Sequence, residues 1–287
     1  EFMQEIWIAL AILGGMGLIF GLVLAVASKV FAVETDPRLE ELTEALPGAN
    51  CGGCGYAGCA AYAEAVLKGQ AEIGKCASGG PAAAEKMAKI MGVEPGAFVR
   101  RVALVRCAGQ HGVDENGKAT GSKMKGYYEG IEDCLAATKV AGRGPLICKF
   151  GCLGFGNCTK VCQHDAIHVV DGVAKVDHEK CVGCMMCAGV CPRNLIIPVE
   201  YDKRVVIACA SKAKGAVTIR GCSAGCVGCG KCEKVCEEGA IHVDQNLAFI
   251  DYTKCTSCGK CATVCPKHLI TDAGLTAPVL EQEHSAS

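Results

Sequence analysis

The sequence has few aromatic residues, which make up 5% of its 287 positions and include a single Trp. Aromatic side chains therefore contribute little to the core, although in most domains they bury much apolar area. The sequence also lacks a P-loop and a recognisable Ser-His-Asp arrangement, so nothing indicates nucleotide hydrolysis or serine acyl transfer. Gly53, Gly55 and Gly58 match G-x-G-x-x-G. No strand is predicted before these glycines, however, which argues against a dinucleotide site.

Cysteine is present in excess, at 24 positions. Twenty of these cysteines fall in two blocks, which superimpose at a constant shift of 74 residues. The paired residues are Cys152, Cys158, Cys162, Cys181, Cys184, Cys187 and Cys191 in the first block, and Cys226, Cys232, Cys236, Cys255, Cys258, Cys261 and Cys265 in the second. The residues between them agree too, since Ala-Ile-His-Val at 166–169 recurs at 240–243. Similarity at a fixed period indicates a duplicated unit.

Each block follows the pattern of bacterial two-cluster ferredoxins. In that pattern three cysteines of a C-x2-C-x2-C run and a fourth from the distant run hold one [4Fe–4S] cube. The second block therefore predicts one site from Cys226, Cys229, Cys232 and Cys265, and another from Cys236, Cys255, Cys258 and Cys261. By the same pattern, the first block predicts a complete site from Cys162, Cys181, Cys184 and Cys187.

Disulfide bonding and zinc binding are the two alternative uses of so many cysteines. Small secreted domains are often stabilised by disulfides, but cysteines three residues apart in C-x2-C-x2-C runs suit sulfurs that converge on one metal centre. Zinc ribbons use paired C-x2-C motifs and lack both the third cysteine and the following C-x3-C-P. The spacing therefore favours iron-sulfur cubes over both alternatives.

A separate group of four cysteines precedes the two blocks. It consists of Cys51, Cys54, Cys59 and Cys76, and it lies between a helix predicted from Pro37 and a helix predicted over 81–91. Four thiolates in so short a segment predict a self-contained [4Fe–4S] site. The glycines between them allow the backbone to wrap closely around such a cube.

The first block departs from the ferredoxin pattern at one position. Phe155 stands where the second block has Cys229, so a site made by Cys152, Cys158 and Cys191 lacks one ligand. Five cysteines are left to supply it: Cys107, Cys134, Cys148, Cys209 and Cys222.

Two partitions of these five cysteines are open. Cys148 completes the defective site and leaves Cys107, Cys134, Cys209 and Cys222 as a further group, or Cys107 completes it and leaves Cys134, Cys148, Cys209 and Cys222. Both partitions use all 24 cysteines at four per cube, which predicts six cubes. If some of the five are ordinary buried cysteines, the number is five.

Residues 6–27 carry no charge, and as a helix that rises about 1.5 Å per residue they span a hydrocarbon core of about 30 Å. This predicts a transmembrane helix over 4–28. Glu5 precedes the apolar run and Lys29 follows it, which places the cluster domains on the cytoplasmic side. Ala-Val-Ala at 25–27 resembles a signal-peptide cleavage site, but the acidic start and the length of the run favour an uncleaved helix that anchors the chain in membrane lipid.

The formal net charge of -1 counts every cysteine as neutral, whereas thiolate-bound cubes carry negative charge. Against this acidic background, residues 96–160 contain ten Lys or Arg and five acidic residues. Ferredoxins are acidic electron donors, so we expect Lys123, Lys125 and Lys139 to help dock one. The alternative for residues 111–126 is a solvated surface loop. No nucleic-acid partner is expected.

The order of these segments resembles the B-subunit family of the Rnf complex, a membrane ferredoxin:NAD⁺ oxidoreductase. The most specific residues are the C-G-G-C-G-Y-A-G-C run at 51–59 and Cys76 directly after the helix, and the two repeats resemble the long, cluster-rich form. The resemblance implies a chain in the cell inner membrane that takes electrons from reduced ferredoxin and passes them to membrane subunits. Those partners would handle flavin, NAD and ion translocation. A polyferredoxin wire of a membrane hydrogenase or related dehydrogenase, and a cluster scaffold, are the alternatives.

The sequence thus predicts an α+β protein. Its expected parts are the transmembrane helix at 4–28, a small helical [4Fe–4S] module at 34–92, a basic connecting segment at 93–147, ferredoxin-like repeats at 148–200 and 201–272, and a flexible tail at 273–287. Short strands are expected around Val169, Val176, Val243 and Ile250.

Overall fold

The structure is a computed structural model of the chain. It describes all residues except 1, 31–35, 96–97, 112–120, 204 and 272–287, and leaves out the side chains of 2–5, 8–12 and 28–30. The tail predicted at 273–287 and the middle of the loop predicted at 111–126 therefore lie outside the described residues. The chain divides into two compact units, residues 1–41 and 42–287.

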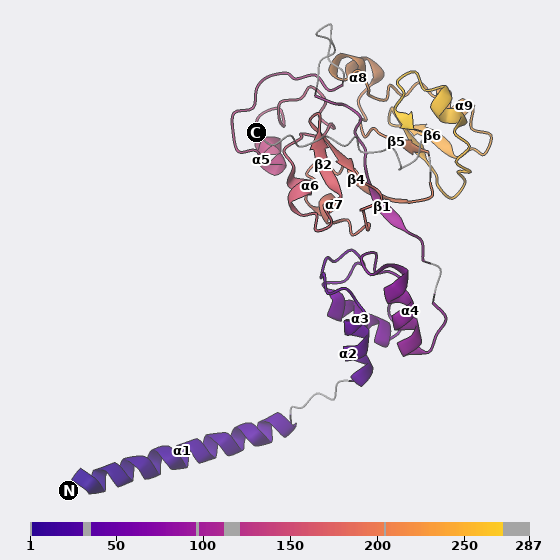
Figure 1. Cartoon of the computed structure of the whole chain (residues 1–287). Coiled ribbons are helices and arrows are strands. Elements are labelled where there is room, and N and C mark those ends of the chain that lie inside the picture. The colour runs from indigo at the N-terminus through magenta and orange to yellow at the C-terminus, as the bar shows by residue number, and fades with distance from the viewer. Residues whose placement is uncertain (1, 31–35, 96–97, 112–120, 204, 272–287) are drawn as a thin grey trace, which may run out of the picture. The chain divides into compact units, whose positions relative to one another are not determined.

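Helix α1 (Phe2–Val30) makes up most of the first unit (Figure 1). Its described large apolar side chains are exposed, including Leu18 at 73% and Phe20 at 60%. Where side chains are described, no helix combines the length and the apolar character that crossing a membrane requires.

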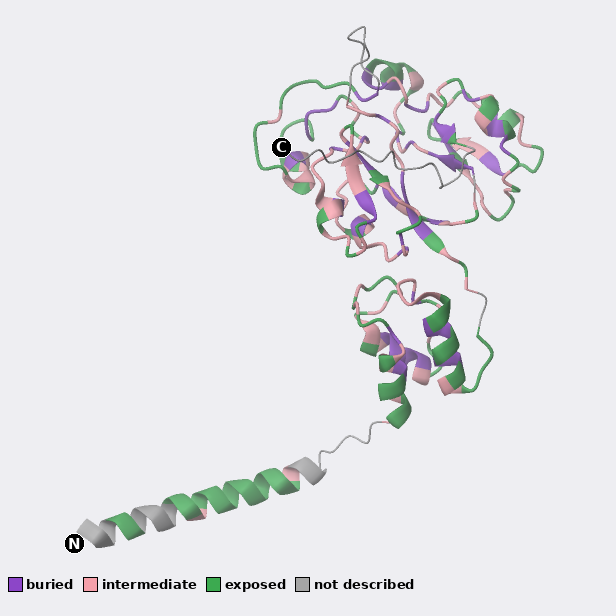
Figure 2. Cartoon of the chain, viewed as in Figure 1, coloured by how far each residue is buried: buried purple, intermediate pink, exposed green. Residues whose placement is uncertain are grey.

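A small helical module opens the second unit. It contains the end of α2 (Pro37–Glu44), α3 (Cys59–Leu67) and α4 (Gly80–Met91). Its helices carry buried positions on their inner sides (Figure 2). Leu42, Tyr62 and Met87 are almost completely buried. The Tyr62 hydroxyl donates to the Glu72 carbonyl at 2.9 Å and accepts from the Lys75 amide at 3.2 Å. These bonds fix the loop that leads into Cys76.

Two antiparallel strand pairs form each ferredoxin-like repeat. Repeat 1 contains β1 (Arg101–Val105) paired with β4 (Ile196–Glu200), and β2 (Ile167–Val170) paired with β3 (Val173–Val176). Repeat 2 contains β5 (Val206–Ile207) paired with β8 (Ile270–Thr271), and β6 (Ile241–Asp244) paired with β7 (Leu247–Ile250). The predicted α+β class is confirmed, and the strands expected around Val169, Val176, Val243 and Ile250 are β2, β3, β6 and β7.

Four short helices each contain the last cysteine of a run, namely Cys158, Cys187, Cys232 and Cys261. They are α6 (Asn157–Lys160) and α7 (Met186–Gly189) in repeat 1, and α9 (Lys231–Lys234) and α10 (Lys260–Thr263) in repeat 2. Each has a residue with a positive φ at its N-terminal end, such as Gly156 at 74° and its repeat equivalent Gly230 at 70°. Glycine adopts this conformation without steric cost, so the loop can turn from the cysteines into the helix. Two further helices, α5 (Cys134–Lys139) and α8 (Gly215–Gly221), lie outside this pattern.

Repeat 1 extends further along the chain than the sequence predicts. Strand β1 lies in the segment expected to be a connection, yet it pairs with β4 in a register that places Val102 opposite Val199. The strands β1, β4, β5 and β8 were not predicted. Two of them contain only two residues, which is too short for an alternation of apolar and polar residues to be recognisable.

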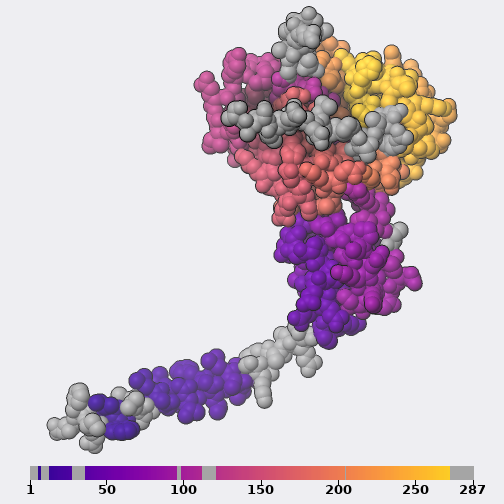
Figure 3. Space-filling view, in the orientation of Figure 1, coloured from indigo at the N-terminus to yellow at the C-terminus, as the bar shows by residue number. Residues whose placement is uncertain are grey.

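The two repeats pack directly against each other (Figure 3). The Ala108 amide of the first repeat donates to the Ala208 carbonyl of the second at 2.9 Å. Ser122 and Cys222 form an isolated antiparallel bridge across the same boundary. Cysteines make up a large part of both cores, and each sheet has only two strands. Two-stranded sheets are marginally stable alone, so the cores depend on what the cysteines bind.

Candidate iron-sulfur sites

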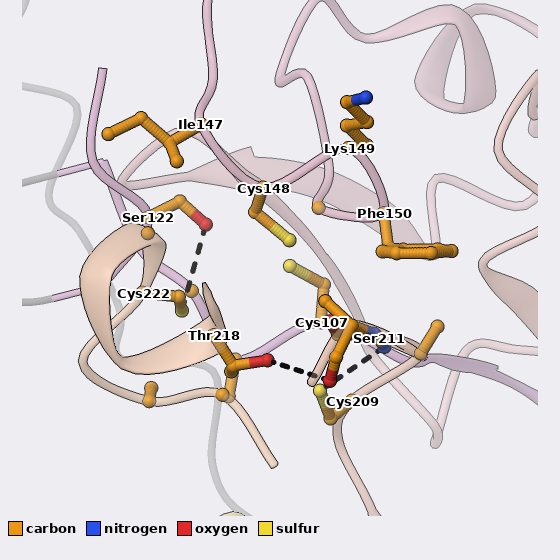
Figure 4. A pocket seen from close by; sticks show the side chains of 18 of the residues that line it. Cys107, Ser122, Ile147, Cys148, Lys149, Phe150, Cys209, Ser211, Thr218 and Cys222 are labelled. Atoms are coloured by element: carbon orange, nitrogen blue, oxygen red, sulfur yellow. Dashed lines mark hydrogen bonds between the residues drawn. The ribbon is translucent and has the colours of Figure 1, made fainter. Parts of the chain in front are cut away.

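Four cavities in the two repeats are each lined by four cysteines. The largest, of about 240 Å³, is lined by Cys107, Cys148, Cys209 and Cys222 (Figure 4). The others have about 80, 30 and 20 Å³, and their cysteines are Cys236, Cys255, Cys258 and Cys261; Cys134, Cys152, Cys158 and Cys191; and Cys226, Cys229, Cys232 and Cys265. The structure thus brings together, in repeat 2, the same two groups that the spacing predicts.

The spacing predicts two further groups from the remaining eight cysteines, Cys162, Cys181, Cys184 and Cys187 in repeat 1, and Cys51, Cys54, Cys59 and Cys76 in the helical module. The other three cysteines of each predicted group raise the pKa of the Cys187 thiol and of the Cys76 thiol, respectively. All 24 cysteines lie in the described part of the chain, and none forms a disulfide. The cavities thus define four groups of four, and two more groups rest on the spacing.

The grouping of the five unassigned cysteines differs from both partitions that the sequence left open. Cys134 joins Cys152, Cys158 and Cys191, so it occupies the place of the missing ligand. We call the large cavity formed by the other four, Cys107, Cys148, Cys209 and Cys222, the bridging cavity.

A local symmetry of the repeats explains the bridging cavity. Cys107 follows β1 by two residues, and Cys209 follows β5 by two residues. The Cys152 amide donates to the Cys107 sulfur at 3.3 Å, and the equivalent Cys226 amide donates to the Cys209 sulfur at 3.4 Å. Each repeat therefore supplies two equivalent cysteines to one cavity.

A constant shift of 74 residues does not reveal this symmetry, because the spacing of these cysteines differs between the repeats. Cys107 precedes Cys148 by 41 residues, whereas Cys209 precedes Cys222 by only 13. The extra residues of repeat 1 contain Cys134. The two equivalent cysteines stand in similar local sequences, Val-Arg-Cys-Ala at 105–108 and Ile-Ala-Cys-Ala at 207–210.

Helix α5 positions Cys134. The Asp133 side chain caps this helix by accepting from the Ala136 amide at 2.7 Å. The Asn157 side chain, from the loop of Cys158, accepts from the Cys134 amide at 2.8 Å. Phe155 packs against the ring of Tyr128, with ring centroids 5.3 Å apart. The inserted segment thus supplies Cys134 as the fourth cysteine of this cavity, and Phe155 contributes to apolar packing instead.

Burial dominates the electrostatics of the cysteines. It raises the pKa of the Cys107, Cys158 and Cys187 thiols to about 12 and that of Cys261 to about 11. Neighbouring cysteines raise these pKa values further. Thiols of this kind hold their protons at pH 7 until a metal displaces them. Iron binding therefore releases protons and weakens as the pH falls.

Arg193 supplies positive charge between the cysteine groups. Its guanidinium donates to the carbonyl oxygens of Cys148 at 3.1 Å and Arg143 at 2.6 Å, and also to that of Gly151. It lies close enough to Cys148 and Cys152 for attraction to their thiolates. Cubes held by four thiolates carry negative charge, which a half-buried guanidinium offsets.

The donor set suits [4Fe–4S] cubes, whose iron atoms are held by cysteine thiolates. In the described part of the chain no three His, Cys, Asp or Glu side chains lie close enough together to hold a single metal ion. A cube is larger than one ion and needs space between its ligands, as in the four cavities that cysteines line. Bound at these groups, cubes would supply one-electron redox chemistry.

Removal of the cubes is expected to unfold both repeats. After oxidation and iron chelation, the backbone amides of β1 to β8 should lose their protection and exchange quickly. The reason is that each sheet has only two strands and its core consists partly of cysteines. Hydrogen exchange with mass spectrometry measures this region by region. Protection in the repeats that survives complete iron removal would contradict the expectation.

Three family profiles match parts of the chain. The FeS family, which describes Fe-S cluster segments, matches residues 46–78, a 4Fe-4S binding domain matches 174–197, and a 4Fe-4S dicluster domain matches 225–269. These matches cover parts of both repeats and the cysteines of the helical module, which we call the Cys51 module. They do not include Cys107, Cys148, Cys209 and Cys222 of the bridging cavity.

Curated relatives are similar over most of the chain. The B subunit of the Na(+)-translocating ferredoxin:NAD(+) oxidoreductase complex of Acetobacterium woodii is 42% identical over 253 residues, which cover 88% of this chain and 73% of that protein. The proton-translocating counterpart of Clostridium ljungdahlii is 40% identical over 251 residues, covering 87% and 85%. The B subunit of the ion-translocating oxidoreductase complex of Methanosarcina acetivorans is 37% identical over 247 residues, covering 86% and 90%.

Proposed function

We propose an electron route through this chain, which belongs to the B-subunit family of the ion-translocating ferredoxin:NAD⁺ oxidoreductases. The chain is an electron-transfer subunit of such a complex, and its 4Fe-4S domains carry that role. The proposed route begins at reduced ferredoxin, runs through cubes of the two repeats to the Cys51 module, and ends at the membrane subunits. Each step moves one electron, which oxidises the donor and reduces the next cube.

The observation that supports this route is that sixteen of the 24 cysteines line four cavities in sets of four, while the spacing of the other eight predicts two further sets. We propose that the chain binds six cubes. Cys134 completes the defective site of repeat 1, and the bridging cavity holds a cube between the repeats. Electron tunnelling slows steeply with distance, so several short steps replace one that would be too long. The bridging cavity shortens the path between the repeats because each contributes two of its cysteines.

The exit from the repeats is proposed at Cys184. A Cβ atom on Gly53 would lie only 2.6 Å from the Cys184 carbonyl oxygen, so the backbone between Cys51 and Cys54 touches the cysteine loop of repeat 1. The Cys184 thiol also interacts electrostatically with Cys51. These contacts support electron transfer from the Cys162, Cys181, Cys184 and Cys187 site directly to the module.

The membrane anchor is part of the same proposal. No charged residue occurs from 6 to 27, and all of these residues belong to α1. We place this helix in the cell inner membrane as a single span, in contact with lipid, with the cluster domains on the cytoplasmic side. Extraction of membranes with carbonate tests the anchor, since an inserted helix stays in the pellet and a peripheral protein leaves it.

Ferredoxin is proposed to dock on exposed lysines of the segment 123–149, which contains α5. Lys123, Lys139 and Lys149 are exposed and form no ion pair with any described residue. Lys125 differs, because its ammonium donates to the Gly142 carbonyl at 2.6 Å and so helps to hold this segment. Lys139 ends the helix that Cys134 begins, which places positive charge near the Cys134 site.

Reversal of this charge is expected to weaken the interaction with ferredoxin. Lys123→Glu with Lys139→Glu should raise the apparent KM for ferredoxin about tenfold at low salt and flatten its salt dependence. The control is Lys86→Glu with Lys89→Glu on α4, which makes the same change in net charge elsewhere. Equal effects of the two pairs on KM would rule out this docking surface.

The direct test of the proposed function is reduction by ferredoxin. The purified full chain, mixed anaerobically with reduced ferredoxin in a stopped-flow spectrometer, should lose the visible absorbance of most of its cubes within the turnover time of the complex. A cluster scaffold would instead transfer iron and sulfide to an acceptor apoprotein. Reduction that stays substoichiometric, together with such transfer, would overturn the proposed route.

A further inference from the structure

The buried serine and threonine hydroxyls that the structure describes lie at one place. They belong to Ser122 and Ser211, each 3% exposed, and to Thr218, 4% exposed. All three line the bridging cavity (Figure 4). Buried hydroxyls are costly unless they form hydrogen bonds, so their partners indicate what they do.

The three hydroxyls have different partners. The Thr218 hydroxyl donates to the Ala213 carbonyl at 3.3 Å, and the Ser211 hydroxyl accepts from the Ala213 amide at 3.3 Å. These two bonds hold the backbone at the edge of the cavity. The Ser122 hydroxyl instead donates to the Cys222 sulfur at 3.9 Å, within the reach of a hydrogen bond to sulfur.

Ser122 is one of several hydrogen-bond donors to the sulfurs of the bridging cavity. The Cys107 sulfur accepts from the Cys152 amide at 3.3 Å, and the Cys209 sulfur accepts from the amides of Cys226 at 3.4 Å and Ser211 at 3.5 Å. The Cys222 sulfur accepts from the Ser122 hydroxyl. At Cys222 a buried side-chain hydroxyl thus has the role that backbone amides have at Cys107 and Cys209.

The surrounding backbone keeps this hydroxyl in place. The Ser122 amide donates to the Gln110 carbonyl at 2.9 Å, and the next amide, of Lys123, donates to the Gly221 carbonyl at 2.9 Å. A Cβ atom on Gly109 would lie 2.4 Å from the Ser122 Oγ and 3.1 Å from the Cys222 sulfur. Only glycine at this position leaves room for the hydroxyl beside the sulfur.

We propose that Ser122 tunes the reduction potential of the cube in the bridging cavity, because its hydroxyl donates a hydrogen bond to the Cys222 sulfur. The proposal rests on the proposed function, in which that cavity holds a cube. Reduction adds negative charge, which a donor aimed at a ligand sulfur stabilises, and the effect is strong where water is excluded. Ser122 therefore raises the potential of this cube and makes it easier to reduce. It acts through Cys222 and is a tuning residue, not a ligand.

The test is an anaerobic redox titration of the full chain, followed by electron paramagnetic resonance, for the wild type and Ser122→Ala. The variant should keep its iron content, and one cube should become about tenfold harder to reduce at a fixed potential, a shift of about 59 mV for a one-electron couple. The other cubes should titrate as in the wild type. Ser211→Ala is the matched control, since it removes an equally buried hydroxyl from the same cavity and leaves the amide donor to Cys209.

The outcomes separate this proposal from the proposed function. An unchanged titration of Ser122→Ala, or the same shift in Ser211→Ala, would overturn the tuning role. Loss of about four iron atoms from Ser122→Ala alone would also overturn it, because Ser122 would then be a structural support. A wild-type chain that itself lacks the iron of one cube would instead contradict the six-cube inventory.

Discussion

Cys134→Ala is expected to lose one cube, about four iron atoms per chain, and to take electrons from ferredoxin at least about tenfold more slowly. Cys134 lines the cavity of Cys152, Cys158 and Cys191, and no other cysteine lines it. Its helix ends at Lys139, beside the proposed docking surface. Loss of this cube lengthens the first electron step. Iron analysis and stopped-flow reduction measure the two effects.

A second substitution separates the loss of a ligand from general damage. Phe155 stands where repeat 2 has Cys229, and the flanking glycines share a left-handed backbone, with φ of 79° at Gly154 and 66° at Gly228. Cys134→Ala with Phe155→Cys should therefore recreate the ferredoxin run and restore both iron content and rate. If Cys134→Ala retains the iron of all cubes, Cys134 is not the ligand and one of the two partitions suggested by the sequence returns.

Gly53→Leu is expected to slow electron transfer from the repeats to the Cys51 module at least about tenfold while iron content stays unchanged. Even a Cβ atom at this position would lie 2.6 Å from the Cys184 carbonyl oxygen, so a leucine side chain must push the two loops apart. Tunnelling slows as the gap widens. Freeze-quench spectroscopy after mixing with reduced ferredoxin follows the module's cube separately from the others.

The control for this variant is Ala57→Leu, which adds a side chain to an exposed position of the same loop. It should leave the reduction of the module as fast as in the wild type. If Gly53→Leu also behaves like the wild type, electrons do not leave repeat 1 through the Cys184 loop, and the proposed order of the cubes is wrong.

Short-range cysteine spacing determined most of what could be predicted. The runs at 51–59, 181–191 and 255–265 have local geometry that a cube requires, so their grouping follows from sequence distance. The strands around Val169 and Val243 follow from the duplicated pattern and from their apolar residues. These elements needed no knowledge of long-range contacts.

The bridging cavity could not be predicted because its cysteines meet only after the repeats have folded and packed. Cys107 and Cys209 are equivalent by their place after β1 and β5, and these strands are defined by pairing with β4 and β8 at the other end of each repeat. The insertion that carries Cys134 hides the equivalence along the sequence. Long-range pairing decided the ligand partition, and sequence distance carries no information about it.

Counting iron and sulfide decides whether the 24 cysteines hold six [4Fe–4S] cubes. Iron and acid-labile sulfide should be determined per chain on protein purified without oxygen, with Mössbauer spectroscopy to identify the cluster type. About 24 iron atoms and about 24 sulfides are expected, all in cubes. About 20 of each would remove one cube, and zinc in place of iron would contradict the claim altogether.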